Sequence, residues 1–341
     1  MARESSNSLR YSKRLIDVTG LRDIVQRRIP VMKLDSRRPG PVVWLTACIH
    51  GDEPGGTAIV QDVFRKLRKV GLECGSLHAL PLINSTGFEN VSRYINAERE
   101  DLNRCFPGNA KGTAGERIAR RIFDLIAETD PALVVDLHND WIQSVPYVVL
   151  EPRAVFSNSV VRQRATRAAA ATGLLVVQES ANEDTTGTLT GALAATGVPA
   201  FTIEAGGACG IVESGVRSGK TAILGVLRQL GMSTIDLDDE RKVSKSARVF
   251  NYTNQPLCTS TGIIRFSVEP GEAVDASQEI GRVYSAFGSL EERLYASRPG
   301  YVLGISDHAR ALPGSEVIAI AEYGEPTPAQ TANDRERRTR K

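Results

Sequence analysis

A histidine and a glutamate three residues apart are the first residues of this chain that could do chemistry. A catalytic zinc ion takes three protein ligands, nitrogen or carboxylate oxygen, and keeps one position open for water. His50 and Glu53, in the tetrapeptide H-G-D-E, could supply two such ligands from one loop. The alternative is structural, because a glutamate here would also favour the start of a following helix through the helix dipole.

A third ligand has few candidates, because the chain contains only four histidines. His138 ends the segment V-D-L-H after an expected strand, His78 lies inside another expected strand, and His308 lies in a C-terminal loop. A histidine at a strand end is more often a hydrogen-bonded structural residue than a ligand, so both interpretations stay open. Asp136, two residues before His138, could support its imidazole, although strand alternation does not decide this.

Glu204 is a candidate general base. It follows the apolar segment Phe201–Ile203 and precedes the glycine pair Gly206 and Gly207. A carboxylate in this position is desolvated on one side, which raises its pKa toward neutrality and suits it to proton transfer. A helix-capping or salt-bridged glutamate is the alternative.

Residues 92–108 have little apolar periodicity, which indicates a long loop, and loops of this size often carry function. Arg93, Asn103 and Arg104 in this loop could hold a carboxylate, since a guanidinium matches a carboxylate with paired hydrogen bonds. The composition alone favours the alternative, a solvated surface loop that forms internal salt bridges.

Taken together, these segments resemble the succinylglutamate desuccinylase and aspartoacylase family, which is related in fold to the zinc carboxypeptidases. The resemblance covers roughly residues 40–325. Its five motifs, in family order, are His50-Gly-Asp-Glu53, Arg93-Tyr-Ile95, Asp101-Leu-Asn-Arg104 with Phe106-Pro-Gly108, Asp136-Leu-His-Asn139 and Ile203-Glu204-Ala-Gly206.

The resemblance implies a role for each motif. It implies that one zinc ion per chain is bound by His50, Glu53 and His138. It further implies that Glu204 and Arg93 are catalytic, as base and as the group that polarises the scissile carbonyl. The substrate-binding residues that it implies are Asn103, Arg104 and Asn139.

The implied activity is that of a zinc-dependent amidohydrolase. It would cleave the linear amide bond of an N-acyl amino acid or a related small carboxylate. Two alternatives remain open from the sequence. One is a metallocarboxypeptidase that acts on a small peptide, and the other is a non-catalytic binding protein on the same fold.

The elements that would position these residues alternate along the chain. Apolar runs and helical periodicity predict six strands and five helices. The expected strands cover residues 42–47, 76–83, 132–137, 145–150, 174–177 and 199–203, and the expected helices cover 57–69, 114–128, 160–172, 189–195 and 216–230. This alternation indicates an α/β fold, for which the resemblance implies a zinc carboxypeptidase-like mixed sheet flanked by helices. Because His50, His138 and Glu204 each follow a strand, one sheet edge could carry all three.

The chain divides into two domains and a tail. Residues 1–232 form the expected catalytic domain, and a polar link follows at 233–246. Short strands separated by turn residues then predict a smaller all-β barrel-sandwich domain at 247–325, with a flexible tail at 326–341. The resemblance implies a biotinyl- or lipoyl-like barrel that narrows the entrance to the site. It would be unmodified, because no lysine lies between Lys245 and Lys341.

Composition limits the partners. The 42 lysines and arginines nearly balance the 40 aspartates and glutamates, so nucleic acid and membrane are not expected partners. The first twenty residues lack an apolar core of signal-peptide length, and five cysteines without CxxC spacing fit a reducing compartment. We expect a cytoplasmic protein with a small carboxylate substrate, and the sequence leaves a homo-oligomer open.

Overall fold

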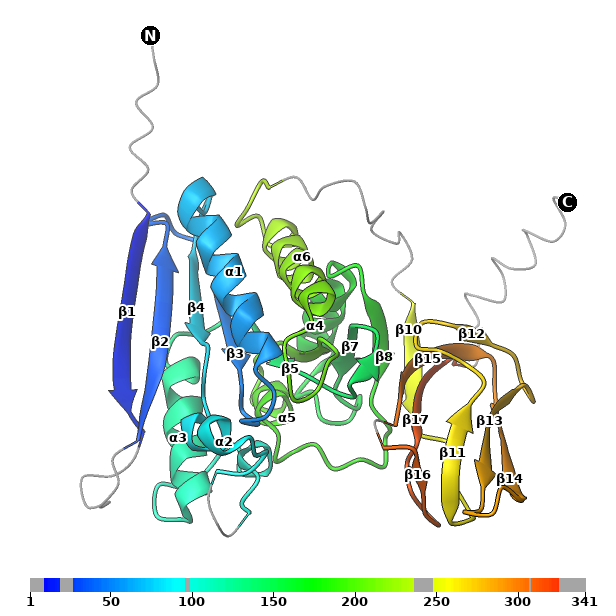
Figure 1. The fold of residues 1–341 in the computed structure, drawn as a ribbon. Coiled ribbons are helices and arrows are strands. Elements are labelled where there is room, and N and C mark those ends of the chain that lie inside the picture. Colours follow the sequence, from blue (N-terminus) through cyan, green and yellow to red (C-terminus); the bar gives the residue numbers. More distant parts are fainter. Residues whose placement is uncertain (1–8, 19–26, 96–98, 236–247, 307, 325–341) are drawn as a thin grey trace, which may run out of the picture.

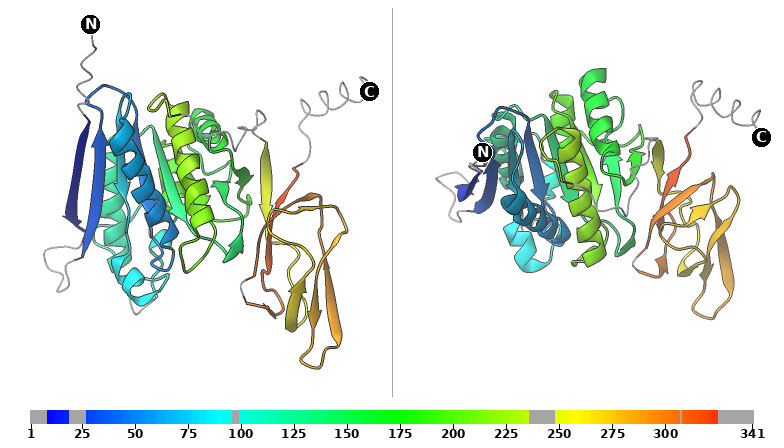
Figure 2. Two further views of the ribbon diagram at one scale, coloured as in Figure 1. Left: turned by 45° about the horizontal axis from the view of Figure 1, so that its top comes forward. Right: turned by 90° about the horizontal axis from the view of Figure 1, so that it is seen from above.

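The computed structural model describes residues 9–18, 27–95, 99–235, 248–306 and 308–324. The predicted tail at 326–341 and most of the predicted link lie outside the described residues. The described part forms a large α/β body with a smaller, β-rich lobe beside it, as Figures 1 and 2 show.

A 13-stranded sheet crosses the whole molecule. Its strand order is β1-β2-β4-β3-β5-β9-β7-β8-β10-β17-β15-β12, and β6 pairs with β15 off this path. The strands of the α/β body are β1 (Arg10–Asp17), β2 (Arg28–Asp35), β3 (Val42–Ala47), β4 (Ser76–Leu80), β5 (Leu133–His138), β6 (Gln143–Ser144), β7 (Tyr147–Leu150), β8 (Leu175–Gln178) and β9 (Ala200–Glu204). Strands β4, β3, β5 and β9 pair in parallel, whereas β7 is antiparallel to β9. The predicted mixed sheet is therefore confirmed.

Helices cover both faces of this sheet. They are α1 (Gly55–Val70), α2 (Ser85–Asn90), α3 (Ala114–Ala127), α4 (Ser159–Ala170), α5 (Leu189–Ala195) and α6 (Glu213–Gln229), with a 3-10 turn η1 (Leu102–Arg104). The buried apolar residues of α1, α4 and α6 form one core with the sheet, and those of α3 and α5 form a second core. Helices α1 and α6 lie side by side in Figure 1. The mixed sheet is thus buried on both sides, which explains why its central strands read as continuous apolar runs.

The C-terminal lobe contains a second, four-stranded sheet of order β14-β13-β11-β16. The strands of the C-terminal lobe, some in this small sheet and some in the large one, are β10 (Val249–Thr253), β11 (Gly262–Phe266), β12 (Ala273–Val274), β13 (Glu279–Tyr284), β14 (Leu290–Tyr295), β15 (Gly300–Ile305), β16 (Arg310–Ala311) and β17 (Ile318–Glu322). A separate apolar core lies between the two layers. The β-rich C-terminal part is confirmed, but β10 pairs in parallel with β8, so hydrogen bonds join it to the α/β body.

Three elements differ from the sequence expectation. The segment before residue 38 forms a hairpin of two full strands, β1 and β2, which the apolar runs do not predict. Helix α2 was not expected, because its six residues are too few to show a period. The strand expected at 76–83 ends at Leu80, since Pro81 follows and lacks the N–H that a strand ladder needs.

Candidate active site

The loop between β3 and α1 carries the first candidate ligands. It joins Ala47 to Gly55, and two glycines let the start of α1 pack closely on the end of β5. A Cβ on Gly55 would lie 2.4 Å from Nδ2 of Asn139, and one on Gly56 would lie 2.7 Å from the Leu137 carbonyl oxygen. The H-G-D-E loop is therefore held against the strand that ends in His138.

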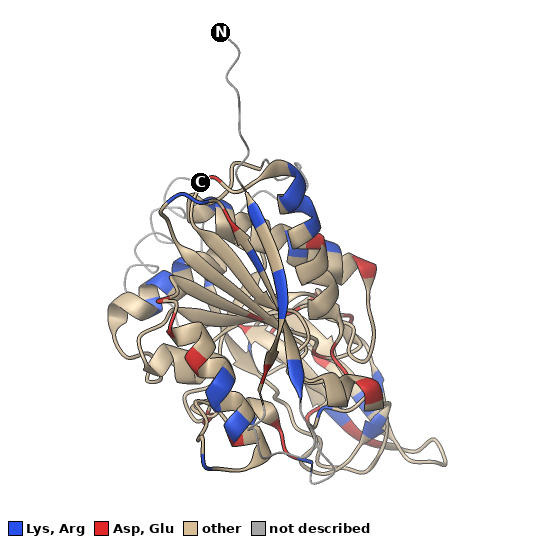
Figure 3. Ribbon diagram, turned by 90° about the vertical axis from the view of Figure 1, so that its left-hand side faces the viewer, with Lys and Arg blue, Asp and Glu red and all other residues tan. Residues whose placement is uncertain are grey.

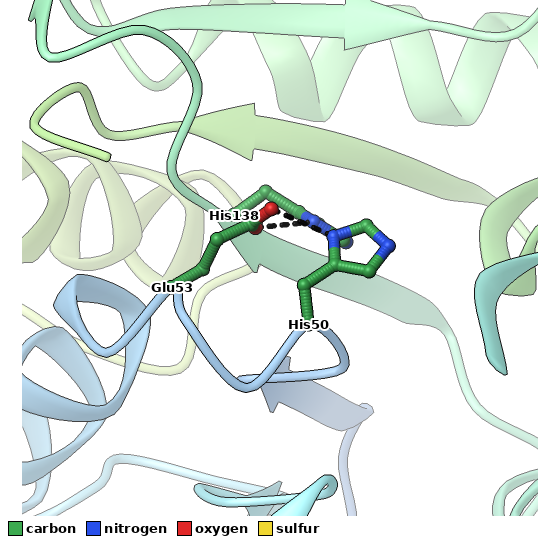
Figure 4. Close-up of side chains that lie close together, drawn as sticks. All are labelled: His50, Glu53 and His138. Carbon is green, nitrogen blue, oxygen red and sulfur yellow. Dashed lines mark hydrogen bonds and ion pairs between the residues drawn. The ribbon is translucent and has the colours of Figure 1, made fainter. Parts of the chain in front are cut away.

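His50, Glu53 and His138 converge, as the sequence predicted. Nδ1 of His50 lies 2.7 Å from Oε1 of Glu53, and Nδ1 of His138 lies 2.9 Å from Oε2 (Figure 4). One donor atom from each residue falls within 4.8 Å of the others, and the three residues are only 3–8% exposed. Among the described residues this is the one His, Cys, Asp and Glu group with metal-binding geometry.

Two aspartates hold the far sides of the imidazoles. Nε2 of His138 lies 2.8 Å from Oδ2 of Asp136, and Nε2 of His50 lies 3.2 Å from Oδ1 of Asp101. Thr46 donates a hydrogen bond of 2.6 Å to the other oxygen of Asp136. A carboxylate on Nε2 fixes the tautomer that leaves the Nδ1 lone pair for a metal ion. Asp136 therefore has the supporting position that its sequence spacing left open.

The charges of this group are strongly coupled. Burial by itself would raise the pKa of Glu53, but the adjacent His138 and His50 hold it well below its usual value. Burial would lower the pKa of His138, yet the carboxylates of Asp136 and Glu53 raise it well above the ordinary value. An ionised carboxylate beside two imidazoles is a nitrogen and oxygen donor set that suits a divalent cation, so the residues fit the implied metal.

Glu204 ends β9 directly opposite His138 in the parallel pairing. Its Oε2 is buried and has no hydrogen-bond partner among the described residues. Burial raises its pKa well above the usual value, and the nearby Asp140 and Glu53 act in the same direction against His138. A carboxyl group beside the candidate metal ligands with an elevated pKa suits proton transfer.

Arg93 lies in the same cluster. Its guanidinium bonds Asp101 at 2.9 Å, and its Nη1 lies 3.2 Å from Nδ1 of His50 and 3.7 Å from Oε1 of Glu53. It thus presents positive charge beside the candidate ligand group, and a group of this kind can stabilise a negatively charged oxygen.

The three predicted substrate-binding residues also line the pocket, but they differ in exposure and in their hydrogen bonds to the rest of the protein. Asn103 is buried and accepts a 3.0 Å hydrogen bond from the Leu189 N–H. Asn139 accepts from the Gly55 N–H and donates to the Gly206 carbonyl, so its amide links α1 to the loop after β9. Arg104 is exposed, which leaves it the most accessible of the three. Their roles toward a substrate stay predictions.

The pocket has a volume of about 240 Å³ and includes residues that the sequence did not single out. Tyr147 donates a hydrogen bond to Asp140 and stacks with Tyr252 of β10, at 6.3 Å between ring centroids. Tyr252 brings the C-terminal strands into the pocket wall. Glu151 also lines the pocket; it follows the apolar strand β7 as Glu204 closes β9, which is the signal that could have identified it.

Known proteins share this sequence pattern and fold. The profile of the succinylglutamate desuccinylase/aspartoacylase catalytic domain matches residues 39–230. The N-α-acetyl-L-2,4-diaminobutyric acid deacetylase of Halomonas elongata is 25% identical over 305 residues, which are 87% of this chain and 86% of that protein. A succinylglutamate desuccinylase/aspartoacylase from Rhodobacter sphaeroides has a TM-score of 0.76 at 24% identity, covering 92% of this chain and 96% of the other.

A more distant structure supports the wider fold relationship. A metallo-carboxypeptidase from Burkholderia cenocepacia has a TM-score of 0.51 at 17% identity and covers 64% of each chain. The predicted carboxypeptidase-like architecture is thereby confirmed. No helix among the described residues is long and apolar enough to span a membrane.

Proposed function

Because the chain belongs to the succinylglutamate desuccinylase/aspartoacylase family, we propose that it is a zinc-dependent hydrolase of N-acyl amino acids or related small carboxylates. The observation that carries the proposal is the convergence of His50, Glu53 and His138 in a pocket that also contains Glu204. Two histidines and one glutamate are the ligand set of several catalytic zinc sites. When bound, the ion would act as a Lewis acid on the substrate carbonyl and lower the pKa of water.

The chain's own residues would carry the proton and the charge. Glu204 takes a proton from the attacking water, whose oxygen forms the new bond to the amide carbon. Arg93 stabilises the negative charge on the carbonyl oxygen. The C–N bond then breaks, and Glu204 returns the proton to the leaving amine. Arg104 and Asn103 hold the substrate carboxylate and so orient the amide.

The Halomonas relative favours a deacylase over a carboxypeptidase. Its name describes removal of an acetyl group from the amine of an amino acid. In that reaction the carboxylate belongs to the amine product, which would place it near Arg104. The proposal also keeps a cytoplasmic location and a homo-oligomer as expectations from the sequence.

Two variants test the proposal together. Glu204→Gln should lower turnover of an N-acetyl amino acid by a factor of ~10²–10⁴ while the metal content stays at the wild-type level. His138→Ala should lose the metal itself. Metal analysis by plasma mass spectrometry and steady-state kinetics measure both. Wild-type turnover by Glu204→Gln would remove this residue from the mechanism, and full zinc in His138→Ala would remove the ligand assignment.

A further inference from the structure

The pocket contains far more negative than positive side chains. Seven carboxylate residues line it, but only two arginines and no lysine do. Glu53 faces the histidines and Glu204 is assigned to proton transfer. Five carboxylates therefore have no part in the proposed hydrolysis; they are Asp140, Glu151, Glu179, Glu183 and Asp184.

Glu151 is the most enclosed of these five. It is 7% exposed and follows Leu150 at the end of β7, whereas Tyr147 at the start of β7 pairs with Glu204. At ~3.4 Å per residue, the Cα of Glu151 lies ~14 Å along the strand from that of Tyr147. Glu151 thus marks the end of the pocket away from the proposed base.

The carboxyl group of Glu151 lies at this end among hydroxyl groups. Thr190 donates a 2.6 Å hydrogen bond to Oε1 of Glu151, whereas Oε2 makes no hydrogen bond of ordinary length and angle among the described residues. The hydroxyl groups of Thr185 and Thr188 lie close enough to lower the pKa of Glu151 through hydrogen bonding, and Oγ1 of Thr185 has no other partner among the described residues. Buried polar atoms are nearly always well hydrogen-bonded in folded proteins, so Oε2 has room for a further donor.

The excess of carboxylates in the pocket favours a cation as that donor. Burial raises the pKa of Glu151, and Asp136 acts in the same direction against the hydroxyl groups of Thr185, Thr190 and Thr188. Glu179 lies on the same side, half-buried, and burial raises its pKa as well. Glu183 and Asp184 add negative charge at the exposed rim.

We propose that this end of the pocket is a subsite for a primary ammonium group on the side chain of the substrate. An ammonium carries three N–H donors on one atom, which suits Oε2 of Glu151 and the neighbouring hydroxyl oxygen of Thr185. The inference rests on the proposed function for the identity of the substrate as an N-acyl amino acid. It narrows that class to N-acyl diamino acids and disfavours acyl derivatives of aspartate and glutamate, whose side-chain carboxylate would face Glu151.

The test compares substrates that differ only in charge. Metal-loaded protein is assayed with Nα-acetyl-L-ornithine against Nα-acetyl-L-norleucine, and with Nα-acetyl-L-2,4-diaminobutyrate against Nα-acetyl-L-norvaline. We expect kcat/KM to favour the ammonium member of each pair by ~100-fold or more, as a site with buried polar groups rejects an apolar analogue. In Glu151→Gln the ratio should shrink by at least ~10-fold, whereas the matched variant Glu322→Gln, outside the pocket, should keep it.

Several results would overturn the subsite while leaving the hydrolase intact. They are equal or faster hydrolysis of the apolar or glutamate derivatives, an unchanged ratio in Glu151→Gln, and a preference for Nα-acetyl-L-arginine over the ornithine derivative. A second metal ion per chain that Glu151→Gln loses would also overturn it, because the oxygens would then serve a metal.

Calorimetry separates this inference from the proposed function. If the wild type hydrolyses none of the amides, the proposed function fails. The subsite is still tested by comparing the calorimetric affinities of free L-2,4-diaminobutyrate and L-norvaline. Tighter binding of the diamino acid that Glu151→Gln abolishes supports the subsite. Equal binding of the two amino acids overturns it.

Discussion

Two glutamates of the same pocket have opposite electrostatic environments. Glu53 lies between two imidazoles, which keep its pKa well below the usual value. Burial instead raises the pKa of Glu204 well above the usual value, with further carboxylates nearby. The first is suited to hold a cation permanently, and the second is suited to accept and release a proton.

The aspartates behind the histidines offer a test at the scale of single residues. Asp136→Asn keeps the side-chain volume but weakens the bond that orients His138, so metal affinity should fall ~10–100-fold. Titration with a metal chelator measures this affinity, and Asp124→Asn on the surface of α3 is the control. Wild-type affinity in Asp136→Asn would show that Asp136 does not position His138.

The sequence predicted the convergence of His50, Glu53 and His138 because histidines are rare in this chain and the order of the motifs is specific. Because the chain contains only four histidines, few residues other than His50 and His138 were candidate nitrogen ligands. Glu151 and Tyr252 were missed for a physical reason. Acidic and aromatic residues are common, and only the pairing of β7 with β9 and of β10 with β8 brings these two to the pocket.

At the scale of elements, the β1–β2 hairpin forms one edge of the large sheet. Arg10, Lys13 and Arg14 place positive charge along β1, which faces the viewer in Figure 3. Charged side chains on an edge strand discourage pairing with another chain. The sequence did not resolve this hairpin, because its strands mix charged and apolar residues and lack a clean alternation.

Next to this hairpin, His78 links stability to pH. Its ring lies 4.7 Å from that of Trp44, and its cross-strand neighbour is Lys33. The pKa of His78 is lowered to about 4, chiefly by burial, with Lys33 and Arg14 acting in the same direction and Asp35 opposing them. The folded protein therefore holds His78 neutral at pH values where a free histidine is charged.

The sign of this linkage gives a prediction. Below a pH of about 6.5 the unfolded chain binds a proton at His78, whereas the folded chain does not until the pH reaches about 4. The free energy of unfolding therefore falls as the pH is lowered from about 6.5 to about 4. We expect the wild type to lose ~1–3 kcal/mol more than His78→Gln over this range. Urea unfolding at several pH values measures the difference. Parallel curves for the two proteins would contradict the prediction.

At the scale of the molecule, the sheet does not stop where the composition changes. The sequence places a boundary near residue 233, where charged residues replace apolar ones. Composition cannot show that β10, just after this link, pairs with β8 and covers Tyr147 with Tyr252. The C-terminal part therefore both completes the pocket wall and protects an edge of the large sheet.

A chain that ends at residue 235 tests this coupling. It would keep every candidate ligand but would expose the edge of β8, whose Val177 is now fully buried, and it would lose the apolar contacts of Phe250. Loss of one such buried aromatic side chain alone removes ~1.5–3 kcal/mol of apolar burial, and an unpaired edge strand favours aggregation. We expect a lower melting temperature than that of the full chain and self-association in sedimentation velocity. A monomeric fragment with an unchanged melting temperature would instead show that residues 1–232 are an independent domain, as the sequence division predicts.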